Sequence, residues 1–323
     1  MDKADNTYRA YVPEGMLMRT AENREYISSE AGLERAMREG KILEACVTLC
    51  DSSMRLHVDL YGMRGIIERR EAVFCRRGEE LKDIAVITRV GKPVCFKVIG
   101  FSEDNGERVA ILSRREAQME CLRSYLSDLI PGDIIPARVT HMEPFGAFVD
   151  IGCGIASLLS VDSISVSRIS HPSDRLCIGE DIYTVIKSID REQERFFVSM
   201  RELLGTWEEN ASSFEAGQTV SGIIRSVESY GIFVELCPNL AGLAELREGT
   251  YDSLSAHIGE RVAVYIKSII PDRMKIKLVL IDSYRESVPP SPKKYFIDCE
   301  RVLHIDRWQY SPAGSSKLIE TVF

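Results

Sequence analysis

The chain has 323 residues, of which 45% are hydrophobic and 28% are charged, with a net charge of −8 and an isoelectric point near 5.4. This composition is typical of a globular protein with several small domains, and it excludes a mainly disordered chain. The acidic balance argues against nucleic-acid binding that depends mainly on neutralising phosphates.

The charge is not uniform along the chain. Residues 40–115 contain 14 Lys and Arg against 11 Asp and Glu, whereas residues 131–201 contain 7 against 10. Only the first third is therefore basic. If the acidic later parts bind nucleic acid, we expect their affinity to depend only weakly on salt, because few phosphates are neutralised.

The first predicted element is a helix within SSEAGLERAMREGK (28–41), which has a serine cap and ends at Gly40. The preceding stretch, MDKADNTYRAYVPEG (1–15), lacks the basic and apolar regions of a secretory signal. No run of about 18 apolar residues occurs anywhere. We therefore expect a cytoplasmic protein that does not contact a membrane.

The nine cysteines are scattered through apolar stretches and include no CxxC pair. Only Cys46 and Cys50 are close together, and no second ligand pair accompanies them. This pattern predicts reduced, mostly buried thiols rather than disulfides or a zinc site.

A repeat dominates the rest of the chain. EPFGAFVDIG (143–152) aligns with ESYGIFVELC (228–237) at an offset of 85, and IGEDIYTVIKSID (178–190) aligns with IGERVAVYIKSII (258–270) at an offset of 80. The five-residue difference falls in a connecting loop, where length changes are tolerated better than in strands. Residues 40–115 contain a fainter third copy, so we predict three units of similar fold.

Each unit alternates apolar and polar residues in short Val- and Ile-rich runs, which indicates strands. In the second unit, strands are expected near 133–142, 146–152, 155–160, 180–189 and 195–200. Five strands in about 70 residues, with a long connection before the fourth, favour a small closed OB-type barrel over a sandwich. Alternation alone is compatible with both architectures.

The predicted fold class is mainly β, with three tandem five-stranded OB barrels joined by short helical linkers and followed by a β-rich C-terminal extension. Helical spacing appears in 114–130 and in 201–214, and the extension contains alternating stretches that suit a hairpin or strands added to a neighbouring barrel. The expected segments are an N-terminal segment with a short helix (1–39), a divergent first barrel (40–115), a helical linker (116–130), a second barrel (131–201), a linker (202–215), a third barrel (216–281) and the extension (282–323).

The repeated segment has rings on both sides of a glycine. Phe145 and Phe148 would face opposite sides of a regular strand, but a bulge or bend at Gly146 would place both on the outer face. Two exposed rings form a stacking platform for the bases of single-stranded nucleic acid, at about 1–3 kcal/mol per base. The alternative is that both rings belong to the core, as aromatic residues in strands usually do.

These strings resemble the S-one RNA-binding domain, named after the first protein of the small ribosomal subunit. The resemblance is strong over 131–201 and 216–280 and weak over 40–115, and the tandem arrangement resembles the bacterial 30S ribosomal protein S-one family in a shortened form. It implies an RNA-binding face built from two aromatics, a histidine, an acidic residue and a basic residue.

Matched position by position, the resemblance places the RNA-binding residues as follows. In the second unit they are Phe145, Phe148, Ser160 at the histidine position, Asp190 and Arg195. In the third unit they are Tyr230, Phe233, Glu245 at the histidine position, Ile270 or Asp272 at the acidic position, and Lys275. His171, in the long loop of the second unit, is a further candidate for RNA contact.

In the first unit the aromatic positions fall on Met54 and His57, which provide no platform. We therefore hypothesise that residues 1–115 dock to protein, for example on the small ribosomal subunit. The alternative is weak RNA binding through the basic run RREAVFCRR (69–77).

The five histidines form no HxxxH or HExxH spacing, and the sequence contains no GxSxG, Walker or GxGxxG string. No segment outside the repeats exceeds about 45 residues, which is short for a catalytic domain. We therefore expect a protein that is not an enzyme and has no metal, cofactor or catalytic residues.

Together the observations predict an RNA-binding protein of the translation apparatus that holds single-stranded mRNA by aromatic stacking. Two other interpretations stay open. The barrels could be docking scaffolds of a protein-interaction adaptor, or the chain could be an RNA-binding regulator that is not a stable part of the ribosome.

Overall fold

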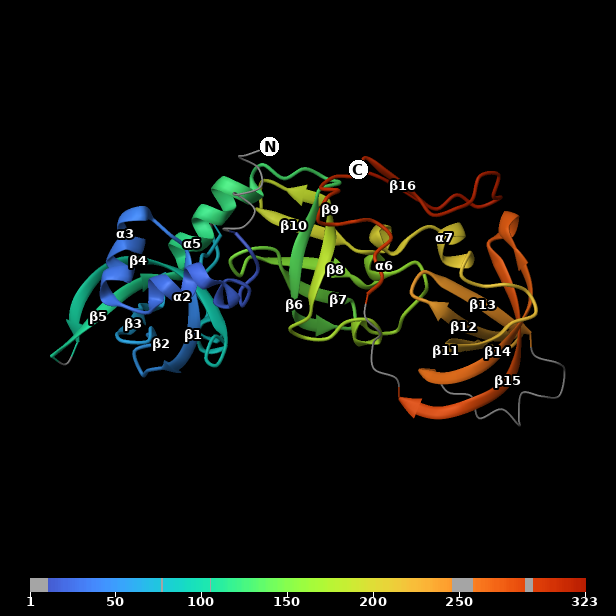
Figure 1. The fold of residues 1–323 in the computed structure, drawn as a ribbon, viewed down its shortest axis with the longest axis horizontal. Coiled ribbons are helices and arrows are strands. Elements are labelled where there is room, and N and C mark those ends of the chain that lie inside the picture. The colour runs from blue at the N-terminus through green and yellow to red at the C-terminus, as the bar shows by residue number, and fades with distance from the viewer. Residues whose placement is uncertain (1–10, 77, 105, 246–257, 288–292) are drawn as a thin grey trace.

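The computed structural model describes residues 11–323 apart from 77, 105, 246–257 and 288–292. The chain forms three closed five-stranded barrels that follow one another along the long axis of the molecule (Figure 1). The predicted fold class is confirmed.

Barrel 1 comprises β1 (Leu43–Cys50), β2 (Leu56–Asp59), β3 (Arg64–Ile67), β4 (Pro93–Asp104) and β5 (Glu107–Ser113). Barrel 2 comprises β6 (Ile134–Glu143), β7 (Gly146–Asp150), β8 (Ala156–Ser160), β9 (Asp181–Asp190) and β10 (Arg195–Ser199). Barrel 3 comprises β11 (Thr219–Glu228), β12 (Gly231–Cys237), β13 (Leu240–Glu245), β14 (Glu260–Ile270) and β15 (Lys275–Ser287).

All three barrels have the same topology. Neighbouring strands are antiparallel except for the third and fifth, which pair in parallel and close each barrel. The strands predicted for the second unit agree with β6–β10 to within two residues at each end. The agreement follows from alternation, since every second side chain, such as Val139, Val149 and Val198, is buried in the barrel interior.

Helices lie mainly before and between the barrels. The predicted N-terminal helix is α3 (Glu30–Glu39), where the Ser29 hydroxyl accepts a hydrogen bond from the Gly32 N–H and Gly40 ends the helix in a left-handed conformation. The other helices are α2 (Ala21–Ile27), α4 (Asp83–Ile87), α5 (Arg114–Cys121), α6 (Val161–Ile164) and α7 (Trp207–Ala211). Short helical turns are η1 (Leu17–Arg19), η2 (Arg69–Glu71), η3 (Leu122–Leu126), η4 (Pro172–Asp174), η5 (Arg201–Leu204) and η6 (Pro271–Arg273).

The two predicted linkers pack against the barrels. Ala117, Cys121 and Tyr125 of the first linker are buried in the core of barrel 2, and Trp207 of the second is buried in the core of barrel 3. None of the nine cysteines forms a disulfide. Among the helices of the described residues, none is long and apolar enough to cross a membrane.

Barrels 1 and 2 meet at a junction of buried charges. The Glu14 carboxylate receives two hydrogen bonds from the Arg114 guanidinium, at 2.7 and 2.9 Å, and a third from the Cys95 N–H of barrel 1 at 3.0 Å. The Glu14 N–H donates to Asp150 of barrel 2 at 2.7 Å. The N-terminal segment is therefore part of the contact between the two barrels.

Two buried carboxyl groups near this junction have raised pKa values. Burial and the neighbouring charge of Glu14 raise the pKa of Asp150 to about 7. Burial raises the pKa of Glu44 to about 7 as well, although the N–H groups of Gly15 and Met18 donate to its carboxylate.

We predict that this part of the protein loses stability as the pH rises from about 5 to about 7. An unfolded carboxyl group releases its proton near pH 4, whereas folded Asp150 and Glu44 retain theirs to about pH 7, so the folded state binds more protons in this window. The stabilisation is complete below the unfolded pKa and is lost above the folded one. Thermal unfolding followed by circular dichroism should show the fall, and Asp150→Asn should reduce its slope. An unchanged slope in that variant would contradict the assignment.

Barrels 2 and 3 meet at a second buried charge cluster. The long loop between β8 and β9 inserts Arg175, which pairs with Glu235 of barrel 3. Glu235 also receives a hydrogen bond from Arg225 at 2.7 Å, and Arg225 lies 3.3 Å from Asp174 of the loop. The side chains of Arg175, Glu235 and Arg225 are each at most 6% exposed, so these three charges are largely removed from solvent.

The C-terminal extension runs back across both barrels (Figure 1). Ile305 donates its N–H to the Gly132 carbonyl of barrel 2, and His304 contacts Asp133 at 2.7 Å. The extension then forms the hairpin of β16 (Arg307–Gln309) and β17 (Glu320–Val322) beside barrel 3, where Trp308 is buried. The expected hairpin is present, and one isolated bridge joins the extension to barrel 2.

Candidate nucleic-acid interface

The two rings of the repeated segment in barrel 2 lie together on its surface. Phe148 is half-buried on β7, and Phe145 is 55% exposed in the two-residue turn between β6 and β7. Their ring centroids are 6.1 Å apart and the rings are perpendicular. Because a turn residue does not follow strand alternation, both rings reach the outer face.

Barrel 3 repeats this arrangement. Tyr230 is 59% exposed in the corresponding turn, Phe233 is half-buried on β12, and their centroids are 6.2 Å apart at an angle of 89°. We call each ring pair a platform. The alternative that the rings belong to the core does not hold for Phe145 or Tyr230.

Glycine is required at this position of each segment, but not for the reason expected from the sequence. Gly146 does not have a positive φ, and it pairs in register with Glu143 and Ser160. A Cβ at this position would lie 2.5 Å from the carbonyl oxygen of Leu159, because β8 passes very close. The bend expected at Gly146 is therefore wrong. The bulge lies on the opposite strand, between Val139 and His141.

Two further rings in barrel 2 accompany the platform and were not predicted. His141 lies opposite Phe148 on β6 and stacks on it, with centroids 6.2 Å apart and an angle of 22°. Phe197 of β10 is half-buried and pairs with Leu158 of β8, which in turn pairs with Phe148, so the three residues form one row across neighbouring strands. Their strand positions were predictable, but the pairing register that brings them beside Phe148 was not.

The other predicted residues of barrel 2 are more dispersed. Ser160 lies at the end of β8 opposite Gly146, next to the Phe145 turn, and donates a hydrogen bond to Ser163. Asp190 and Arg195 lie opposite each other in the β9–β10 register. Arg195 is two residues along β10 from Phe197, which belongs to the same cross-strand row as Phe148. Asp190 also accepts hydrogen bonds from the backbone N–H groups of the turn that follows it.

His171 has a local structural role. Its ring accepts a hydrogen bond from the backbone N–H of Ser173, and its backbone N–H donates one to the Asp174 carboxylate, so His171 caps η4. In barrel 1, His57 at an aromatic position is buried and bonded to Asp51 at 2.9 Å. Barrel 1 thus has no ring pair at these positions, as the sequence suggested.

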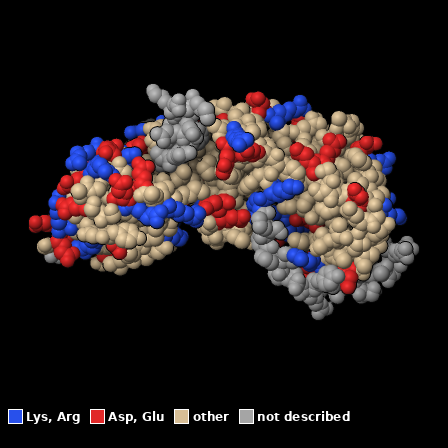
Figure 2. Space-filling model, viewed as in Figure 1, with Lys and Arg blue, Asp and Glu red and all other residues tan. Residues whose placement is uncertain are grey.

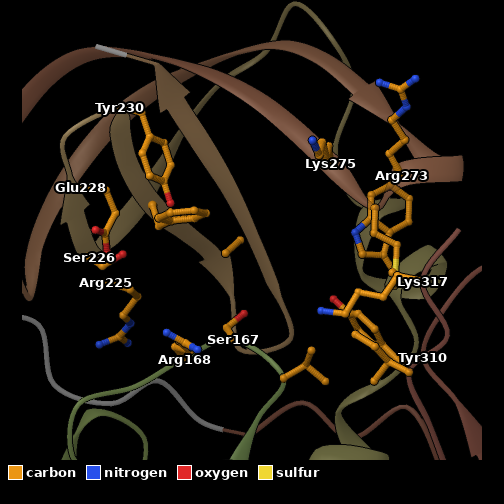
Figure 3. A pocket seen from close by; sticks show the side chains of 16 residues that line it. Ser167, Arg168, Arg225, Ser226, Glu228, Tyr230, Arg273, Lys275, Tyr310 and Lys317 are labelled. Carbon is orange, nitrogen blue, oxygen red and sulfur yellow. The ribbon is translucent and has the colours of Figure 1, made fainter. Parts of the chain in front are cut away.

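In barrel 3 the structure brings three of the predicted residues to one cavity of about 480 Å³. Tyr230, Phe233 and Lys275 line it, with Tyr230 and Lys275 visible in Figure 3. Of the alternatives for the acidic position, Ile270 pairs with Lys275 across the hairpin and Asp272 lies in η6. Glu245, at the histidine position, is paired with Lys277 at 3.4 Å, which partly neutralises its charge.

The visible face of the molecule has no single basic field. Lys and Arg are interspersed with Asp and Glu over the barrel 1 end in Figure 2, despite the positive balance of residues 40–115. Among the described residues, no group of three or more His, Cys, Asp or Glu side chains is placed to hold a metal ion. Ring surfaces, rather than a dominant charge field, are the feature that barrels 2 and 3 share.

Comparisons with known proteins show which sequences this chain resembles. The family model of the S1 RNA binding domain matches residues 128–201. The small ribosomal subunit protein bS1 of Staphylococcus aureus is 31% identical over 208 residues, which is 63% of this chain and 51% of that protein. The bS1 protein of Rhizobium meliloti is 27% identical over 69% of this chain and 40% of its own length. The chain thus spans about half the length, or less, of these relatives.

A solved structure of a multidomain protein with nucleic acid binding domains from Streptococcus pneumoniae also matches. It covers 75% of this chain and 73% of its own at 13% identity, but its TM-score of 0.24 is too low to support an argument. The similarity is established by the family model and by the bS1 proteins. Residues 128–201 match the S1 RNA binding domain, and over 63–69% of its length the chain is similar to small ribosomal subunit protein bS1.

Proposed function

We propose that this protein binds single-stranded RNA through the platforms of barrels 2 and 3, and that it acts on mRNA in translation. The observation that supports this most directly is the recurrence of one exposed, perpendicular ring pair at equivalent positions of two barrels. Its relatives named as small ribosomal subunit proteins support the translational setting.

The ring pairs suit unpaired bases. The exposed ring of each pair, Phe145 or Tyr230, stands perpendicular to a half-buried one, so a base can stack on one ring while its edge meets the other. Every base has a π-face, so such stacking tolerates many sequences. In the second barrel, His141 and Phe197 extend the aromatic surface, while Ser160, Asp190 and Arg195 supply polar groups around it.

We predict that single-stranded RNA binds much more tightly than a duplex of the same sequence, because paired bases cannot stack on the rings. Titration of a labelled unstructured oligonucleotide, with and without its annealed complement, measures the difference. Equal affinity for both forms would mean that the protein recognises the phosphate backbone and would reject stacking.

We further propose that residues 1–115 contribute docking to the small ribosomal subunit. Barrel 1 has no ring pair at the platform positions, while its surface combines acidic and basic side chains suited to a protein partner. Co-sedimentation with small subunits should then persist after nuclease digestion of free mRNA. Complete release by the nuclease would show that RNA alone tethers the protein.

A further inference from the structure

The cavity beside the platform of barrel 3 has walls from three parts of the chain. Tyr230 and Lys275 belong to barrel 3, Arg168 belongs to the long loop of barrel 2, and Tyr310 and Lys317 belong to the C-terminal extension. Figure 3 shows Tyr230 on one side, Arg168 across from it, and Tyr310 with Lys317 on a third side. An isolated barrel 3 would have only the first of these walls.

The walls are fixed to one another by hydrogen bonds that centre on one buried residue. Asn239, in the turn between β12 and β13, accepts a hydrogen bond from the Val166 N–H of the barrel 2 loop at 2.9 Å. Its backbone carbonyl accepts one from the Tyr310 hydroxyl of the extension. The Tyr310 carbonyl in turn accepts a hydrogen bond from the Trp207 N–H at 3.0 Å. The cavity is therefore formed before any ligand arrives.

The charge of the cavity is strongly positive. Arg168, Arg273, Lys275 and Lys317 are all exposed, and within the described part of the chain none of them has a carboxylate partner at ion-pair distance. Arg225, which also lines the cavity, differs because Glu235 and Asp174 neutralise it. The one acidic residue in the lining is Glu228.

We propose that this cavity is a composite nucleotide pocket, in which a base stacks on the barrel 3 platform while Arg168 and Lys317 bind phosphates of the same RNA strand. Its volume of about 480 Å³ lies within the range of about 300–1,000 Å³ typical of small-molecule pockets. Unpaired cations facing aromatic rings match the two chemical parts of a nucleotide. The inference depends on the proposed function, and it gives the extension a direct role in RNA binding.

The test uses the full chain and an unstructured RNA oligonucleotide, with affinity measured at several salt concentrations. Each phosphate contact on single-stranded nucleic acid contributes about 0.7 to the slope of log affinity against log salt. Arg168→Ala and Lys317→Ala should each weaken binding and reduce the slope by about 0.7, and the double variant by about 1.4. Arg301→Ala is the matched control, because Arg301 is a tail cation that is 87% exposed and lies outside the cavity.

The outcomes separate this inference from the proposed function. Phe233→Ala should weaken binding with little change in slope, since it removes stacking and no phosphate contact. If Phe233→Ala weakens binding while the Arg168→Ala and Lys317→Ala slopes equal that of Arg301→Ala, the composite pocket is wrong and the platform alone binds RNA. If the wild type does not bind the oligonucleotide, both proposals fail.

Discussion

Replacing both Phe148 and Phe233 with alanine should weaken the binding of single-stranded RNA by about 30-fold to 20,000-fold. Stacking of a base on an aromatic side chain is worth about 1–3 kcal/mol, so under the proposed function the loss from two independent platforms is about 2–6 kcal/mol. Both rings are half-buried on the barrel surface, so their removal leaves the barrel interiors intact. Fluorescence anisotropy with a labelled oligonucleotide measures the change.

Tyr61→Ala is a suitable control for this pair. Tyr61 is 76% exposed on barrel 1, and its ring has no partner ring among the described residues. Its removal should leave RNA affinity unchanged. If the double variant keeps wild-type affinity and a native circular dichroism spectrum, stacking is not the mechanism, and the rings are better explained as a surface for a protein partner.

Replacing Glu235 with alanine should destabilise barrel 3 by about 3–5 kcal/mol. The change leaves Arg175 and Arg225 buried with no carboxylate between them, although Asp174 still contacts Arg225. An unpaired buried charge is one of the few causes of so large a loss from one substitution. The intact cluster itself contributes much less to the free energy of unfolding, because the desolvation of its charges offsets much of their attraction.

Tryptophan fluorescence reports this change selectively. The chain has two tryptophans, Trp207 and Trp308, and both are buried in the core of barrel 3. In urea unfolding followed by this signal, Glu228→Ala is the matched control, because Glu228 is an exposed acidic residue of the same barrel. The control should change the free energy of unfolding by less than about 0.5 kcal/mol. Equal midpoints for the two variants would show that the cluster is not required for stability.

A second variant tests the cause. In Glu235→Leu/Arg175→Met/Arg225→Met, apolar side chains replace both the acid and its partners, so no buried charge is left unpaired. Much of the stability lost in Glu235→Ala should return. If it does not, the loss reflects a cavity or a packing defect rather than charge.

The sequence was sufficient to predict the barrels and the rings because both follow from local patterns. Alternation determines which side of a strand faces the core, and the repeat showed that Phe145 and Tyr230 occupy the same place in two units. The reason for Gly146 could not be predicted in this way. It depends on the approach of the Leu159 carbonyl from another strand, which is a tertiary distance.

The sequence did not predict the buried charges at the two junctions, although some of these residues lie within the repeat. Asp150 and Glu235 occupy equivalent positions of the two aligned segments, and each appeared to be an ordinary charged residue near a strand end. Their partners are distant in sequence, since Glu14 precedes Asp150 by 136 positions and Arg175 precedes Glu235 by 60. Single-sequence patterns contain no record of such pairs, so the burial of these acids was visible only in three dimensions. The same holds for the wall that Lys317 adds to barrel 3.

The buried charges at the second junction have a consequence for how the two platforms act together. Because Arg175 and Glu235 lock barrel 2 to barrel 3, the distance between the ring pairs is set by the protein and not by a flexible tether. The fixed spacing between the ring pairs then sets a minimum length of RNA that can contact both of them. An RNA too short to span both ring pairs gains only one of them, whereas a strand just long enough gains both at once, so affinity should rise in a step with length rather than gradually.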